Sequence, residues 1–159
     1  MTNYLVATIK PWNVEAFHTA ASELPGEWHL VTSPDDLTTE LLQNLLPRYI
    51  FFPHWSWKVP EHITAAYECV CFHMTDLPYG RGGSPLQNLI LRGHKDTMVS
   101  ALKMIPELDA GPIYSKQALS LDGSAEEIYQ RLAAVCVELM EEIVARQPSP
   151  VRQQGDPVY

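Results

Sequence analysis

Short apolar runs alternate with segments of helical periodicity along the first half of the chain. Apolar residues recur at helical spacing over 13–24 and from Ser33 to Pro47, and Pro60 opens a short helix that reaches about Tyr67. Strands that alternate with helices pair in parallel through right-handed crossovers. The pattern therefore predicts an α/β fold with a Rossmann-like, doubly wound, mostly parallel sheet. The predicted strands cover 4–9, 28–32, 49–52 and 69–73.

The second half adds two predicted capping boxes. Ser84 is expected to begin a helix that ends at Gly93, and Ser124 a long helix that Pro148 ends. Two further strands over 97–103 and 111–119 are expected to form an added antiparallel pair. The apolar residues of the long helix share one face: Ile128, Leu132, Val135, Leu139 and Ile143.

The size of the chain, 159 residues, fits a single domain, which we place at 1–148. The segment 149–159 has little apolar content and is expected to be an extended or loosely docked tail. The long C-terminal helix could pack on a partner copy, and the short N-terminal half leaves sheet surface that a second copy could cover. A homodimer is therefore a possible assembly.

Composition and charge narrow the function classes. Hydrophobic residues make up 46% and charged residues 19%, as in ordinary globular domains. The net charge of −8 repels phosphate backbones and makes a nucleic-acid partner unexpected. No apolar run is long enough to span a membrane, and no basic region precedes an apolar N-terminal stretch. Three cysteines fit a reducing compartment, so we expect a cytoplasmic protein.

Ligands of doubly wound sheets bind beyond the carboxyl ends of the strands, which directs attention to the loops after Ile9, Phe52, His73 and Lys103. The first of these loops lacks the glycine fingerprint of dinucleotide sites. The second carries two tryptophans, either an aromatic wall for a ligand or plugs for the end of the sheet. A nicotinamide or flavin dinucleotide bound in the usual mode is thus not expected, whereas a flat aromatic ligand remains open.

The loops around the fourth strand hold the candidate chemistry. Cys69, Cys71 and His73 alternate and so share one face of their strand. No second cluster completes a zinc set, and buried cysteines explain the pattern better, so no metal is expected. The glycines of the next turn permit close backbone approach to a ligand, or simply a tight turn. Asp109 is either a backbone cap or, if it faces His73, a functional partner.

These residues resemble the signature of the folate-dependent formyltransferases, the family of the glycinamide ribonucleotide, methionyl-tRNA and sugar N-formyltransferases. The run His-Met-Thr-Asp-Leu-Pro over 73–78 is followed by Gly-Arg-Gly-Gly over 80–83 and by Ser-Pro-Leu-Gln over 84–87. Leu-Asp-Ala-Gly-Pro-Ile over 108–113 resembles a downstream family motif, and Trp-Lys-Val-Pro over 57–60 an upstream one. The resemblance covers about 49–145, and residues 1–48 match only as a shortened Rossmann-like half.

The resemblance implies an N-formyltransferase that uses N10-formyltetrahydrofolate as co-substrate. His73 and Asp109 take the positions of the catalytic histidine and aspartate, and Cys71 takes the position of the family's asparagine. That amide donates a hydrogen bond to the oxyanion, which a thiol does poorly. Asn88 or a backbone N–H of the glycine turn could substitute. Alternatively, the protein binds folate or nucleotide with weakened catalysis, or it hydrolyses formyl groups.

The remaining site residues follow from the same resemblance. Methionyl-tRNA is disfavoured as acceptor by the charge and by the lack of a tRNA-binding domain in the sequence, and the amine of a small metabolite, an amino sugar nucleotide or an amino acid-like compound, is expected. Residues expected to bind the acceptor are Lys10, Trp12, Arg81, Gly82 and Gly83. Residues expected to bind the folate are Trp55, Ser56, Trp57, Val59, Ile105, Glu107 and Leu108.

Overall fold

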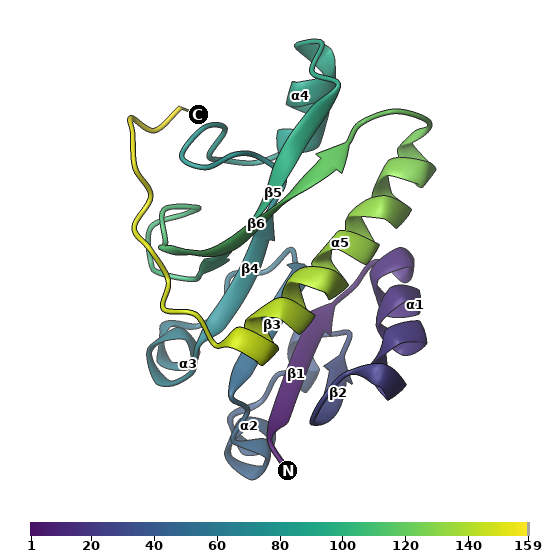
Figure 1. The fold of residues 1–159 in the computed structure, drawn as a ribbon. Coiled ribbons are helices and arrows are strands. Elements are labelled where there is room, and N and C mark those ends of the chain that lie inside the picture. Colours follow the sequence, from purple (N-terminus) through teal and green to yellow (C-terminus); the bar gives the residue numbers. More distant parts are fainter. Residues whose placement is uncertain (159) are drawn as a thin grey trace.

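One six-stranded sheet organises the molecule, in the order β2-β1-β3-β4-β5-β6 (Figure 1). The computed structural model describes residues 1–158. The first four strands pair in parallel, whereas β5 is antiparallel to both β4 and β6. The predicted α/β class and the added antiparallel pair are confirmed. The strands are β1 (Asn3–Thr8), β2 (Glu27–Val31), β3 (Tyr49–His54), β4 (Cys69–His73), β5 (Asp96–Lys103) and β6 (Ile113–Ser120).

Helices cover the two faces of the sheet unequally. On one face, the long α5 and α1 lie across the strands, as Figure 1 shows. On the other face, α2 and α3 pack over a smaller core. Alternation along each strand assigns its residues to the two faces, so that Phe72 faces α5 while Cys69 faces α3. The helices are α1 (Pro11–Ala20), α2 (Thr39–Leu45), α3 (Glu61–Ala66), α4 (Pro85–Leu91) and α5 (Ala125–Arg146).

Local signals placed the long helix well. Ser124 accepts a hydrogen bond from the Glu127 N–H, and the Glu127 side chain accepts one from the Ser124 N–H, so the predicted capping box is confirmed. The predicted apolar face of α5 is buried throughout. This face packs on the chain's own sheet, which removes the helix as an argument for a partner copy. The homodimer therefore stays a prediction.

The capping box predicted at Ser84 is wrong. Ser84 has φ 53°, in the left-handed region, and its side chain makes no capping hydrogen bond. The glycine turn over residues 80–83 precedes Ser84, which therefore lacks the extended backbone conformation of an N-cap residue. The helix itself forms over Pro85–Leu91, with proline in its first turn as expected.

The helix predicted to start at Ser33 is divided in two. Ser33 caps only a 3-10 turn, Pro34–Asp36, and α2 begins after Thr38, whose hydroxyl accepts from the Leu41 N–H. The competing cap at Thr38 explains the division, because a second residue of the same type offers a second start. Among the leucines between Ser33 and Pro47, only Leu42 is buried.

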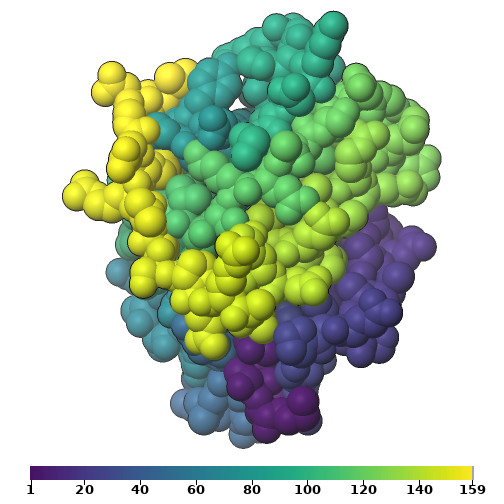
Figure 2. All heavy atoms as spheres, in the orientation of Figure 1, coloured from purple at the N-terminus to yellow at the C-terminus, as the bar shows by residue number. Residues whose placement is uncertain are grey.

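The segment after α5 is extended, as predicted, and it is attached to the body of the protein (Figures 1 and 2). Val151 pairs with Ile113 at the start of β6, and Val158 pairs with Tyr79. In Figure 2 this yellow segment lies on the surface over the teal part of the chain.

Among the helices of residues 1–158, none is both long and apolar enough to cross a bilayer.

Candidate active site

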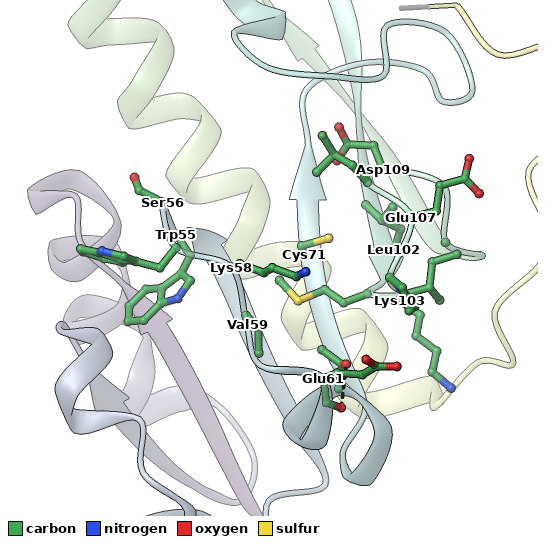
Figure 3. Close-up of a pocket in the computed structure, with 17 residues that line it drawn as sticks. Trp55, Ser56, Lys58, Val59, Glu61, Cys71, Leu102, Lys103, Glu107 and Asp109 are labelled. Atoms are coloured by element: carbon green, nitrogen blue, oxygen red, sulfur yellow. Dashed lines mark hydrogen bonds between the residues drawn. The ribbon is translucent and has the colours of Figure 1, made fainter.

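A cavity of about 510 Å³ opens on the α3 side of the sheet. The loop after β3 and α3 supply one wall, and β4, β5 and the β5–β6 loop supply the other (Figure 3). Its volume lies in the range of small-molecule sites. Seven residues expected to bind folate lie on its lining: Trp55, Ser56, Trp57, Val59, Ile105, Glu107 and Leu108.

His73 lies beside Asp109, at the edge of this cavity. The His73 Nδ1 is 3.6 Å from Asp109 Oδ1, and the His73 Nε2 is 2.6 Å from the Gly80 carbonyl oxygen. Both ring nitrogens thus have a protein partner, and His73 is buried. Asp109 is the member of the pair that lines the cavity. Asp109 therefore faces His73, which was the condition for interpreting it as a functional partner.

The β5–β6 loop reaches the site by a route that the strand-end rule did not anticipate. Because β5 is antiparallel, Lys103 pairs with Val70 at the start of β4, away from its carboxyl end. The loop then folds back along the sheet, so that Asp109 arrives beside His73. A close approach makes this possible: a Cβ on Gly111 would lie 1.8 Å from the Lys103 carbonyl oxygen, so only glycine fits there.

The Cys71 side chain points from β4 toward the cavity (Figure 3). Burial, reinforced by the Asp109 carboxylate, raises the pKa of the Cys71 thiol to about 12. At neutral pH the thiol is therefore protonated, available as a weak hydrogen-bond donor and unreactive as a nucleophile.

The glycine turn is tied to Asp109 and does not line the cavity. The Gly82 N–H donates to Asp109 Oδ2 at 2.9 Å, so this N–H is not free to serve as a substitute oxyanion donor. Gly83 and Asn88 line a separate cleft of about 20 Å³. The Arg81 guanidinium donates to the Gln153 side chain and lies 3.9 Å from Glu107. Arg81 does not line the cavity either.

The other residues expected to bind the acceptor lie apart from the cavity. Trp12 stacks on Tyr129 of α5 with ring centroids 4.8 Å apart, on the opposite face of the sheet. Lys10 lies over Trp12, 5.6 Å from the ring centroid. Burial and then the nearby Lys10 charge lower the pKa of His54, which ends β3. The role predicted for Trp12 gains no support from this placement, because its ring face is occupied by protein.

Several lining residues were missed from the sequence. Lys58 extends from the loop after β3 into the cavity, and Glu61 and Thr64 line it from α3 (Figure 3). Leu102 faces it because it pairs with Cys71 across the ladder. A signal existed for Leu102, since alternation places it on the face of Ser100. The sequence also gave no signal for Gln153 of the C-terminal segment, which contacts Arg81 and Asp109 without lining the cavity.

Within residues 1–158, no group of three or more His, Cys, Asp or Glu side chains is arranged to hold a metal ion. Cys69 and Cys71 share a face with His73, as predicted, but Cys69 packs into the apolar core beneath α3.

Comparison with known proteins gives this geometry a family. A methionyl-tRNA formyltransferase of Rickettsia felis is 30% identical over 133 residues, which cover 80% of this chain and 44% of the relative. The solved structure of a methionyl-tRNA formyltransferase from Clostridium thermocellum is 42% identical, with a TM-score of 0.94 over all of this chain and 72% of that one. No family model matches the chain.

A more distant structure shares the fold. HypX from Aquifex aeolicus, solved in complex with tetrahydrofolic acid, is 20% identical with a TM-score of 0.80 over 98% of this chain and 28% of its own. At that identity the likeness concerns the fold alone. The match to the Clostridium structure is much stronger, and this chain belongs to the formyltransferase family that includes the methionyl-tRNA formyltransferases. It spans less than half the length of the Rickettsia relative.

Proposed function

We propose that the protein transfers a formyl group from N10-formyltetrahydrofolate to a primary amine. The observation that carries this proposal is the Asp109–His73 pair at 3.6 Å beside a cavity of about 510 Å³. Transfer breaks the bond from the formyl carbon to N10, forms a bond to the amine nitrogen, and moves one proton from the amine to N10. Asp109 faces the cavity and takes the proton from the amine. His73, which lies behind Asp109, stabilises the protonated carboxyl group and helps to pass the proton on to N10.

The lining of the cavity supports folate as the formyl donor. Trp55 and Trp57 meet edge to face with centroids 5.1 Å apart, and Val59, Leu102 and Met104 add apolar surface. Such a lining suits a flat heterocycle. HypX from Aquifex aeolicus and the formyltransferase PseJ, which share this fold, were both solved with tetrahydrofolate bound. In the folded protein the protonated Cys71 thiol is a donor that reaches the same cavity.

For the acceptor we retain the amine of a small metabolite, an amino sugar nucleotide or an amino acid-like compound. The net charge of −8 supports this choice, because an acidic protein repels the phosphates of a large nucleic acid. The formyltransferase PseJ from Anoxybacillus kamchatkensis was solved with a formamido sugar nucleotide, although at 16% identity it speaks for the fold only.

Methionyl-tRNA is the second candidate acceptor. The observation in its favour is the 42% identity to a protein that bears this activity in its name. A local cluster of positive charge would be sufficient for a tRNA acceptor arm even on an acidic protein. The two acceptors make opposite predictions for salt, because binding to tRNA weakens steeply as salt rises and binding to a small amine does not.

The test is a turnover assay with both acceptor classes. The protein is incubated with N10-formyltetrahydrofolate and either methionyl-tRNA or a panel of amino sugar nucleotides and amino acids, and release of tetrahydrofolate is measured with mass spectrometry of the product. Formylated amine supports the proposal and identifies the acceptor class. Formate without formylated amine would indicate a hydrolase, and folate binding without turnover a binding protein.

Cys71→Asn sharpens the same proposal. An amide donates a stronger hydrogen bond to an oxyanion than a thiol does, and one such donor is worth about 10²–10³ in kcat. Because the thiol already supplies part of this, we expect kcat to rise by about tenfold to 100-fold. Cys136→Ala on the other face is the control for general effects of removing a thiol. A fall in kcat for Cys71→Asn with folding intact would show that the thiol itself is needed.

A further inference from the structure

One side chain of the C-terminal segment, Gln153, joins the glycine turn over residues 80–83 to the β5–β6 loop that carries Asp109. Gln153 Oε1 accepts from Arg81 Nε at 3.2 Å and Nη2 at 2.9 Å. Its Nε2 donates to the Asp109 carbonyl oxygen at 2.7 Å and to the Gly111 carbonyl oxygen at 2.9 Å. The amide therefore uses all four of its hydrogen-bonding positions on these two loops.

Neighbouring backbone contacts hold the segment in register. Val151 and Ile113 exchange backbone hydrogen bonds at 2.7 and 2.8 Å, and the Arg81 N–H donates to the Val158 carbonyl at 2.8 Å. Gln153 thus lies between two anchored points, one on each loop. Figure 1 shows the segment running beside β6 toward the glycine turn.

The geometry at Asp109 explains why such a hold matters. Asp109 has φ 54°, a left-handed conformation that residues other than glycine adopt rarely. Its carboxylate must satisfy two directions at once, toward His73 Nδ1 with Oδ1 and toward the Gly82 N–H with Oδ2. Hydrogen bonds to the carbonyls of Asp109 and Gly111 hold the backbone on both sides of this turn.

We propose that Gln153 is a positioning residue that orients the Asp109 carboxylate toward His73 by clamping the glycine turn to the β5–β6 loop. Its catalytic consequence rests on the proposed function, whereas its structural consequence does not. An amide is required because only it offers two donors and two acceptors at one position. A carboxylate would keep Arg81 but oppose the two carbonyls, and an apolar side chain would lose both sides of the clamp.

The first experiment needs no turnover. Hydrogen exchange of the Gly82 amide is followed by NMR in the full chain, in Gln153→Met, and in Gln154→Met as the matched control at the exposed next residue. We expect the Gly82 amide to exchange roughly tenfold faster in Gln153→Met, because its bond to the Asp109 carboxylate is loosened, and to be unchanged in Gln154→Met. Unchanged exchange in Gln153→Met would overturn the proposal.

The second variant, Gln153→Glu, retains an Arg81 partner and so guards against loss of folding. Gln153→Glu should also make the Gly82 amide exchange faster than in the parent protein. An unchanged exchange rate would show that the two N–H donors of the Gln153 amide are not required.

Kinetics then connect the clamp to catalysis. With the acceptor found in the turnover assay, Gln153→Met should lower kcat by about 100-fold, a typical loss for catalytic groups displaced by about 1 Å. KM for the formyl donor should rise much less, because the tryptophan wall is untouched. An unchanged kcat in a variant with altered Gly82 exchange would overturn the catalytic part. If the parent protein transfers no formyl group, the proposed function fails and Gly82 exchange alone decides the clamp.

Discussion

The two faces of the central sheet differ in what they are built to do. On the α1/α5 face, aromatic and aliphatic side chains pack into one continuous core from Tyr4 to Val144. On the α2/α3 face the core is smaller and gives way to the cavity, where Trp57, Ile105 and Leu108 remain exposed. The α5 face holds the strands in place, and the α3 face leaves apolar surface uncovered beside Asp109.

If the proposed function holds, this difference means that the protein separates stability from chemistry by sheet face. Alternation along β4 puts Phe72 into the continuous core and Cys71 and His73 on the cavity side, one residue apart. Mutations on the two faces should therefore affect different measurements, and this separation can be tested.

The largest effect is expected at His73. His73→Ala should lower kcat for formyl transfer by about 10²–10⁴, the usual contribution of a general acid–base group. His62→Ala is the matched control, since His62 is exposed on α3 of the same face. The measurement is kcat with circular dichroism to confirm folding. Equal kcat values in the two variants would place the chemistry elsewhere.

A paired leucine deletion compares the faces directly. Leu139 on α5 is 0% exposed and Leu108 at the cavity mouth is 67% exposed. Leu139→Ala should lower the free energy of unfolding by about 2–5 kcal/mol through lost burial and a cavity, whereas Leu108→Ala should change it by less than about 0.5 kcal/mol. Leu108→Ala should instead weaken folate binding. Urea denaturation and folate titration measure the two quantities, and equal destabilisation would refute the division of roles.

The smallest expected effect is a difference in alkylation between the thiols of Cys71 and Cys136. Burial raises the pKa of Cys71 and of Cys136 to about 12. The thiolate is the reactive form, so alkylation of Cys71 should be slow at pH 7 and accelerate by about tenfold per pH unit toward 12. A tetrahydrofolate analogue should protect Cys71, which lines the cavity, and Cys136 should react only on unfolding. Peptide mass spectrometry reads both sites, with Cys71→Ser as control.

The raised pKa values of these two thiols also predict that the free energy of unfolding falls at alkaline pH. Their pKa values are higher in the folded protein than the ordinary value of 9.0, so folding favours the protonated form. This contribution is complete below pH 9 and is lost as the pH rises toward about 12. Stability that stayed constant over this interval would contradict burial of the thiols.

Local patterns were sufficient for much of the fold, and the resemblance to the formyltransferases supplied residues that the structure brings to the candidate site. Periodicity gave the strand–helix alternation, and the capping box at Ser124 gave the start of α5. The same kind of signal misled at Ser84, because the backbone conformation set by a glycine turn overrode the residue type. Motif order gave His73 and Asp109 together, although no local pattern could place them within 3.6 Å.

By itself, the sequence determined which residues alternate between the faces of the sheet and where the long helix α5 starts, because these depend on near neighbours along the chain. Only the tertiary structure decided that the β5–β6 loop turns back to bring Asp109 to His73. It also decided that the Trp12 ring stacks on Tyr129, and that Gln153 reaches the carbonyl of Asp109, 44 residues away along the chain. Such contacts depend on how whole elements pack and on where loops can pass, and the chain's local preferences contain no record of either.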